Sequence, residues 1–343
     1  MIRFESTVAG PFERGQEFGT VHAAQVAASA TAYLDLFAAC APGTSVRPLV
    51  DSLGAQALLR VEEWAPSLAA EIQGIALGAG VPVEHVAAIN ARTEILSVLR
   101  FGAMGECSTV VSVGRLAMQN WDWFTEMSAN FLEWTIPHPD GRRVTTMTEF
   151  GMVGKIGVNE RGLGTLFNIL HHRDDGADVG VPVHVVARQI LDSAGDVFEG
   201  LTVARDAAAA GVCASTSITI VDGSSAVAAE FWPGGLGTAA PDDDGLLLRT
   251  NHFLSSPACD GDTWEERGSD TMVRLGALAQ ALKGTISAED ALSVLSDHDA
   301  GVCAHPAPAT IPGYTNATLA TVTLDLPARS LTITPGLPCT TAA

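Results

Sequence analysis

The order of helix-like and strand-like segments constrains the fold of this chain most strongly. The first hundred residues carry apolar side chains at helical spacing, whereas short β-branched or alternating runs begin after Gly105. Two helical pairs, at about 182–209 and 269–297, interrupt the later strands. This order does not fit the strict β–α alternation of a doubly wound parallel sheet. It predicts an α+β fold, with two stacked antiparallel sheets and helices on both outer faces.

The chain shows no repeat or linker, so residues 1–343 are expected to form one domain. The predicted helices cover 18–39, 52–78, a segment opened by Pro82 that runs through Leu96, 182–192, 194–209, 269–283 and 287–297. The predicted strands cover 108–113, 115–120, 131–137, 143–148, 153–159, 164–170, 215–221, 226–232 and 246–250, with a closing hairpin of 319–325 and 330–334.

The charge of the chain narrows the classes of partner. It has 39 acidic and 19 basic residues, a formal net charge of −20. Because nucleic acids and anionic membranes are bound through Lys and Arg, neither is an expected partner. A neutral or cationic small molecule fits this charge better. The N-terminal residues lack the basic and apolar runs of a secretory signal, and no run of about 20 apolar residues occurs, which predicts a cytoplasmic protein.

Of the six cysteines, Cys107 has neighbours that indicate chemistry. It precedes a predicted strand, and the next strand ends in Gln119-Asn120-Trp121-Asp122-Trp123, so a hairpin of the two brings Asp122 close to Cys107. The other cysteines, at 40, 213, 259, 303 and 339, form no Cys-x-x-Cys pair and have no close histidine cluster along the chain. We therefore expect no zinc site and no cofactor. His171-His172 is interpreted as a polar strand end, since adjacent strand residues point to opposite faces.

The chemistry of a thiol suggests a role for a free N-terminus at Cys107. A cysteine with an ordinary pKa of about 8.5 needs a base near neutrality. A free α-amino group, with a pKa of about 7.7–8.0, would serve if the bond before Cys107 were cut. Asp122 could then hold the new ammonium group. The residues alone leave open that Cys107 is a buried core cysteine and Asp122 a turn acid or helix cap.

Several segments resemble one family. Glu106-Cys107-Ser108-Thr109-Val110, followed by Gln119 to Trp123, resembles the fungal penicillin acyltransferases of the acyl-CoA:6-aminopenicillanic acid acyltransferase family. These are cysteine N-terminal-nucleophile (Ntn) hydrolases. Five further segments resemble the same family, in order over nearly the whole chain. They are Gly10 to Gly19, Ile89 to Ile95, Gly154 to Gly164, Thr250 to Phe253 and Thr334 to Cys339.

The resemblance implies a four-layer αββα sandwich and autoproteolysis between Glu106 and Cys107. The products would be an α chain of residues 1–106 and a β chain of residues 107–343. Cys107 matches the nucleophile, Asp122 the acid that binds its amino group, and Asn251 the amide that stabilises the oxyanion. Arg274 matches an arginine beside the nucleophile, whose charge would lower the thiol pKa.

Other positions are less specific. Asn168 is either a second oxyanion donor or a sheet-edge amide, and by spacing alone Asn251 is also explained as a turn residue and Arg274 as a solvated helix arginine. Glu106 replaces the glycine of a known family member, and Val273 replaces the usual serine before the arginine. Arg92 and Glu94 are interpreted as a structural pair that positions the cleavage loop.

Three functions remain open at the level of sequence. The first is an amidohydrolase that cleaves a small amide or peptide through a thioester acyl-enzyme, and this is the one we favour because water is always available. The second is an N-acyltransferase, in which an amine resolves the same intermediate. The third is an unprocessed homologue that binds a small molecule. The α and β fragments would stay associated, and the sequence leaves a homo-oligomer open.

Overall fold

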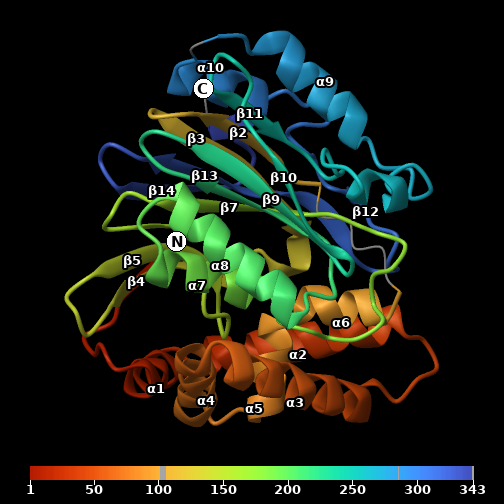
Figure 1. The fold of residues 1–343 in the computed structure, drawn as a ribbon. Coiled ribbons are helices and arrows are strands. Elements are labelled where there is room, and N and C mark those ends of the chain that lie inside the picture. Colours follow the sequence, from red (N-terminus) through yellow and green to blue (C-terminus); the bar gives the residue numbers. More distant parts are fainter. Residues whose placement is uncertain (101–105, 285, 342–343) are drawn as a thin grey trace.

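The protein is described by a computed structural model that covers residues 1–100, 106–284 and 286–341. Gly105 lies outside the described residues. The chain folds into four layers, helices, sheet, sheet and helices, as Figure 1 shows. The four-layer αββα sandwich predicted from the sequence is confirmed.

Most of the chain belongs to regular elements. The helices are α1 (Pro11–Val21), α2 (Ala23–Cys40), α3 (Val46–Trp64), α4 (Pro66–Ala79), α5 (Val83–Asn90), α6 (Arg92–Val98), α7 (Val183–Ser193), α8 (Val197–Ala210), α9 (Thr271–Ala281), α10 (Ala288–Leu295) and α11 (Pro338–Thr341). The strands are β1 (Ile2–Glu5), β2 (Ser108–Ser112), β3 (Leu116–Phe124), β4 (Phe131–Pro137), β5 (Arg143–Glu149), β6 (Ile156–Asn159), β7 (Gly164–Ile169), β8 (Thr216–Val221), β9 (Ala226–Trp232), β10 (Gly235–Ala239), β11 (Leu246–Arg249), β12 (Ala307–Pro308), β13 (Thr315–Asp325) and β14 (Ser330–Pro335).

Two sheets form the centre of the sandwich. The first has eight strands in the order β1-β4-β5-β6-β7-β8-β9-β10, and only the β1–β4 pair among them is parallel. The second has the order β11-β2-β3-β13-β12, with β14 paired to β13. Apolar side chains of both sheets, such as Val111 and Leu166, are buried in one cluster between them. Burial of this apolar surface is the main force that joins the two sheets.

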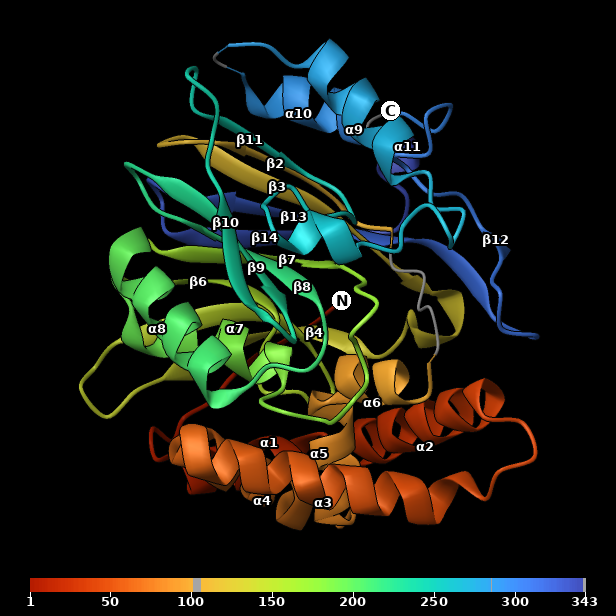
Figure 2. The ribbon, with the colours of Figure 1, turned by 45° about the vertical axis from the view of Figure 1, so that its right-hand side comes forward.

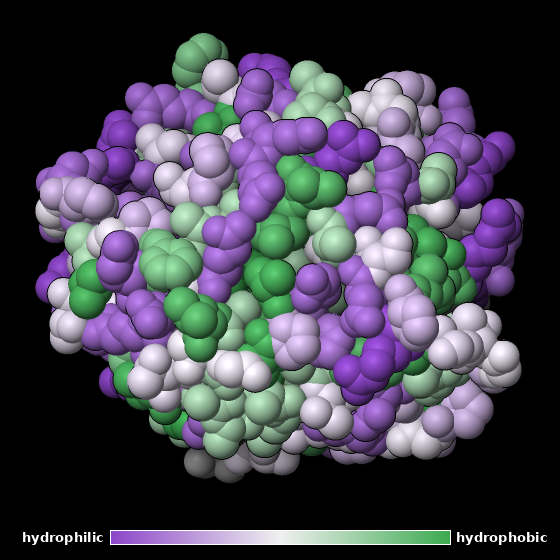
Figure 3. Space-filling model, turned by 90° about the horizontal axis from the view of Figure 1, so that it is seen from below, coloured by the Kyte–Doolittle hydropathy of each residue, from purple (hydrophilic) through white to green (hydrophobic). Residues whose placement is uncertain are grey.

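Helices cover both outer faces. The N-terminal helices α1–α6 and the pair α7 and α8 lie on the outer side of the first sheet, and α9 and α10 lie on the second (Figure 2). Phe18 of α1 and Trp134 of β4 share one buried cluster, whereas Val110 of β2 and Leu278 of α9 share another. Figure 3 views the N-terminal helices from below and shows hydrophilic and hydrophobic side chains mixed on their outer surface.

The helix boundaries differ from the sequence expectation in three places. The predicted helix from Pro82 through Leu96 is divided at Ala91 into α5 and α6. The predicted helix 52–78 is divided into α3 and α4 at Ala65, because Pro66 disfavours the helical conformation of the residue before it and lacks a backbone N–H. The predicted helix 18–39 begins earlier and is interrupted at His22. By length and composition α2 is apolar enough to cross a membrane, and one of its faces, with Tyr33 and Phe37, is buried in the protein core.

Candidate active site

Cys107 stands at the start of β2, on the side of that strand that faces the first sheet. Strand alternation places Cys107, Thr109 and Val111 between the sheets and turns Ser108 and Val110 toward α9 and α10. The predicted hairpin is present, because β2 pairs antiparallel with β3 and Ser108 lies opposite Asn120. The Cys107 thiol is therefore 3.9 Å from the backbone oxygen of Asp122, and both residues are buried.

Arg274 of α9 connects the residues on both sides of the Glu106–Cys107 bond. Its Nη1 donates to the Glu106 carbonyl oxygen at 2.9 Å, to the Cys107 carbonyl oxygen at 3.1 Å and to the Ser108 hydroxyl at 3.1 Å. Its Nη2 pairs with the Glu106 carboxylate, and its Nε is 2.6 Å from a carboxylate oxygen of Asp270. The guanidinium is fully buried. A permanent positive charge is thus hydrogen-bonded to the carbonyl that autoproteolysis would attack.

The two predicted asparagines lie beside Cys107 and Arg274. Asn168 of β7 donates from Nδ2 to the Cys107 carbonyl oxygen at 3.1 Å and accepts from the Thr109 hydroxyl at 2.8 Å. Asn251, just after β11, donates from Nδ2 to the Ile169 carbonyl at 2.9 Å, and its Oδ1 accepts from Arg274 at 3.2 Å. Asn168 thus holds the backbone of Cys107, whereas Asn251 orients the guanidinium.

The electrostatic environment of the thiol disfavours the thiolate in the uncut chain. Burial, and then the negative charge of Asp122, raise the pKa of Cys107 to about 11, whereas Lys155 and Arg274 lower it. Burial also raises the pKa of Asp122 to about 7, partly offset by the Thr318 hydroxyl and by Arg274. Neither carboxylate oxygen of Asp122 meets hydrogen-bond geometry with a donor of the described residues. Such a buried acceptor pair is suited to a cation that provides N–H donors.

A second buried polar cluster under the site was missed by the sequence analysis. Glu149 of β5 receives hydrogen bonds from Lys155 Nζ at 3.0 Å and from the Tyr33 hydroxyl, and it pairs with Arg92 at 3.2 Å. The Lys155 ammonium lies 3.9 Å from the centre of the Trp121 ring. Burial lowers the pKa of Lys155 to about 7. The signal was a set of charged residues inside apolar segments, but no spacing rule joins positions that far apart in the chain.

The predicted Arg92–Glu94 pair is wrong. Arg92 is bound to Glu149, and Glu94 accepts the backbone N–H of Val183 at 2.8 Å instead. Burial raises the pKa of Glu94 to about 8, and the nearby Arg92 charge only partly offsets this. Both residues come from α6, where positions two apart do not share a face, so a direct pair is disfavoured by helix geometry.

A polar cavity of about 180 Å³ lies just beyond the end of β7. It is lined by Ser97, Arg100, His171, His172, Arg173, Asp175, Thr263 and Arg267. Among the described residues its three arginines form no ion pair with a carboxylate. His171 and His172 were expected on opposite faces, yet both line this cavity, because β7 ends at Ile169 and strand alternation stops there.

The cavity is lined by residues of two segments that also carry or contact residues of the site around Cys107. His171 follows Asn168 on the same chain segment after three residues, a span of about 10 Å at the rise of an extended chain. Arg267 precedes Ser269, whose hydroxyl donates to the Glu106 carboxylate at 3.0 Å. The cavity is therefore formed by the chain segments that also carry Asn168 and contact Glu106.

Two solved structures resemble the chain at low sequence identity. They are a mutant of the conjugated bile acid hydrolase from Clostridium perfringens and penicillin V acylase from Agrobacterium tumefaciens. The first has 13% identity and a TM-score of 0.45, and it covers 67% of this chain and 92% of that chain. The second has 14% identity and a TM-score of 0.38, and it covers 67% of this chain and 84% of that chain.

Sequence similarity is stronger. A curated relative from Emericella nidulans, the 40 kDa form of acyl-coenzyme A:6-aminopenicillanic-acid-acyltransferase, is 30% identical over 241 residues. The match covers 68% of this chain and 64% of that relative, so the chain spans slightly less than two thirds of its length. Residues 112–338 match the family model described as acyl-coenzyme A:6-aminopenicillanic acid acyl-transferase. The chain therefore belongs to the acyl-coenzyme A:6-aminopenicillanic acid acyl-transferase family.

Proposed function

We propose that this chain is a self-processing enzyme whose Cys107 becomes an N-terminal nucleophile that cleaves small amides. The observation that carries the proposal is the hydrogen bond from Arg274 to the Glu106 carbonyl. This bond lies next to the buried thiol and to the Asp122 carboxylate, whose oxygens have no hydrogen-bond partner among the described residues. Buried donors aimed at a carbonyl oxygen stabilise the charge that develops there in acyl transfer. The cytoplasmic location stays a prediction.

Self-processing would use the groups of the uncut chain. The Cys107 sulfur attacks the carbonyl carbon of Glu106, and the developing oxyanion is stabilised by Arg274. The thiol proton passes to the amide nitrogen and the C–N bond breaks, which gives a thioester on Cys107 and a free α-amino group. Water then adds to the thioester, the C–S bond breaks, and the Glu106 carboxylate and the thiol are released.

The cut enzyme would gain the base that the uncut chain lacks. The new α-amino group, with an ordinary pKa of about 7.7–8.0, takes the thiol proton as Cys107 attacks a substrate amide and returns it to the leaving amine. When protonated, this group supplies N–H donors to the Asp122 carboxylate, which has none within the described part of the chain. Departure of Glu106 removes one acceptor from Arg274 Nη1 and one from Nη2, which a substrate oxyanion could replace.

Acyl transfer is the second candidate function, and it is supported by the match to a family that is named for an acyl-transferase. Both reactions share the acyl-enzyme on Cys107 and differ in whether water or an amine attacks it. Exposure of the cut protein to amides and acyl thioesters, with and without added amine, would distinguish them. Release of free acid without amine supports hydrolysis, whereas an acyl-enzyme that persists until an amine is added supports transfer.

The polar cavity indicates the kind of substrate. Its three arginines, which have no carboxylate ion pair within the described part of the chain, fit an anionic group, such as a carboxylate, on the acyl or the amine part. This differs from the neutral or cationic substrate expected from the net charge, because local charge at the site decides binding. Arg173→Gln or Arg267→Gln should raise KM for an acidic amide at least tenfold and leave KM unchanged for its neutral analogue. Equal effects on both substrates would contradict this assignment.

The basic test of the proposal is the state of the purified chain on a denaturing gel. Two fragments of unequal size that become one band in Cys107→Ala support the enzyme. A single full-length band in the wild type, with Cys107 unlabelled by thiol reagents, supports instead the alternative of an unprocessed small-molecule-binding homologue.

A further inference from the structure

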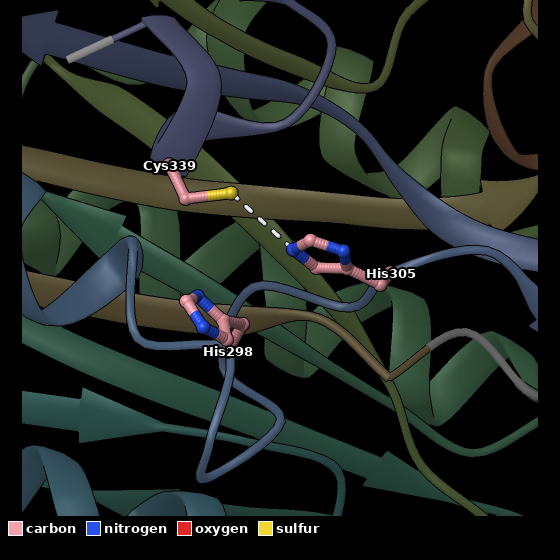
Figure 4. Close-up of side chains that lie close together, drawn as sticks. All are labelled: His298, His305 and Cys339. Carbon is pink, nitrogen blue, oxygen red and sulfur yellow. Dashed lines mark hydrogen bonds between the residues drawn. The ribbon is translucent and has the colours of Figure 1, made fainter. Parts of the chain in front are cut away.

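Two histidines and a cysteine lie close together at a second place, near the C-terminus. His298 and His305 come from the segment between α10 and β12, and Cys339 comes from α11 (Figure 4). One ligand atom from each lies within 4.8 Å of the other two. Residue spacing did not predict a zinc site here, since the fold brings Cys339 to His305 from 34 residues away.

The distances fit a tetrahedral metal ion. The Nε2 atom of His305 is 3.3 Å from the Cys339 sulfur. With Zn–S bonds of about 2.3 Å and Zn–N bonds of about 2.0–2.1 Å, a tetrahedral site places its nitrogen and sulfur ligands about 3.5 Å apart. Thiolate and imidazole are also the ligand types that zinc prefers. The third ligand atom lies within 4.8 Å of these two, so the exposed His298 ring has to rotate to complete a tetrahedral site.

The neighbourhood of the cluster supports a built site. The buried Cys303 thiol, 1% exposed, donates to the Cys339 sulfur at 3.6 Å. A hydrogen bond to a ligating sulfur is a typical outer contact of metal sites. His298 and His305 are both exposed, so an ion can enter from solvent. The formal charge of −20 also attracts cations to the protein.

We propose that His298, His305 and Cys339 bind one zinc ion, with solvent as the fourth ligand, and that this ion fastens α11 to the segment before β12. The segment between the histidines supports the catalytic strands. The Val302 carbonyl accepts from Asn120 at 2.9 Å, and the Ala304 carbonyl accepts from the Thr318 N–H at 2.8 Å. Thr318 lies opposite Asp122 in the sheet. The ion therefore stabilises the pairing of β13 with β3 at the position of Asp122.

Metal analysis of the full chain tests this assignment independently of catalysis. The protein is purified under reducing conditions, dialysed against trace zinc, and analysed for bound metal by mass spectrometry. We expect one zinc per chain, and none in His305→Gln or Cys339→Ser. Cys303→Ala, which removes the outer hydrogen bond, should weaken zinc binding about 10- to 100-fold. Cys259→Ser, an exposed cysteine at another place, is the matched control and should keep the metal.

Cobalt provides a second readout that identifies the ligands. Co²⁺ added to the metal-free protein should give the intense visible bands of a tetrahedral site and a near-ultraviolet thiolate charge-transfer band. The charge-transfer band should be lost in Cys339→Ser and kept in Cys259→Ser. No zinc and no cobalt spectrum in the reduced protein would overturn the proposal. Metal bound equally by wild type and by both ligand variants would overturn it too.

Discussion

Replacement of Arg274 tests the chemistry of the Glu106–Cys107 bond most sharply. Its Nη1 lies 2.9 Å from the Glu106 carbonyl oxygen, inside the range of about 2.7–3.1 Å expected for an oxyanion donor. Loss of one such donor typically costs about 2.7–4 kcal/mol of transition-state stabilisation, or 10²–10³ in rate. The Glu106 and Asp270 carboxylates already neutralise part of the charge. We therefore expect Arg274→Gln to slow self-processing by about 100-fold, near the lower end.

The self-processing rate of Arg274→Lys should lie between the rates of the wild type and of Arg274→Gln. The substitution by lysine keeps a charge but loses the planar fork that reaches two carbonyls, a hydroxyl and a carboxylate together. The assay follows loss of the full-length band with time after synthesis. Arg3→Gln, which removes a largely exposed arginine from the pair with Glu133, is the control and should process at the wild-type rate. Circular dichroism and a melting curve confirm that each variant is folded.

A folded Arg274→Gln protein that processes within threefold of the wild-type rate would refute this reasoning. The Glu106 carbonyl would then be polarised by another group, and the hydrogen bond from Arg274 would be structural.

The same geometry leads to three further expected outcomes. In a Cys107→Ala background, Asp122→Asn should stabilise the uncut chain at pH 8 but not at pH 4. The pKa of the Asp122 carboxyl is about 7 in the folded chain against 3.8 in the unfolded chain, so the carboxyl favours folding below pH 3.8 and this advantage is lost as the pH rises through 7. The free energy of unfolding, measured with urea, should change by at most about 4 kcal/mol from this cause. A gain that is equal at both pH values would contradict the prediction. Glu106→Gln should speed processing severalfold, measured by the same band assay, because it frees Arg274 from a competing carboxylate, and slower processing would argue that the carboxylate assists. Lys155→Met should slow alkylation of Cys107 by iodoacetamide at pH 6, where Lys155 with its pKa of about 7 is mostly charged, because that charge lowers the pKa of the thiol. Alkylation is followed by peptide mass; the rate at Cys259 should not change, and an unaltered rate at Cys107 would contradict the coupling.

The layer order was predictable because it follows from local patterns. Strand runs such as 108–113 and 319–325 alternate or are β-branched, and each helix of the helical pairs has one apolar stripe. The type of each element can therefore be predicted from a window of about ten residues. The errors arose where a single residue overrides the pattern, as at Pro66, or where a strand is short and exposed, as in β1 with its 41% exposed Ile2.

The site was predictable in part, for a similar reason. Cys107 and Asp122 are joined by one hairpin, which spacing can reveal, and the family resemblance indicated Asn251 and Arg274. The roles of the two asparagines, the Tyr33–Arg92–Glu149–Lys155 cluster and the cluster of His298, His305 and Cys339 depend on contacts between distant segments. The Tyr33–Glu149 and His305–Cys339 partners, for example, are 116 and 34 residues apart. Only the packed fold brings such residues together, since no local pattern encodes a partner at that separation.

The measurement that tests the account most directly is the intact mass and N-terminal sequence of the purified wild-type chain. Cleavage between Glu106 and Cys107 predicts a fragment of residues 107–343 that begins with Cys107, and a single uncut mass in Cys107→Ala. After a short exposure to a reactive acyl thioester, the 107–343 fragment should gain the mass of one acyl group, which hydroxylamine removes. An uncut wild-type chain, or acylation that persists in Cys107→Ala, would contradict the account.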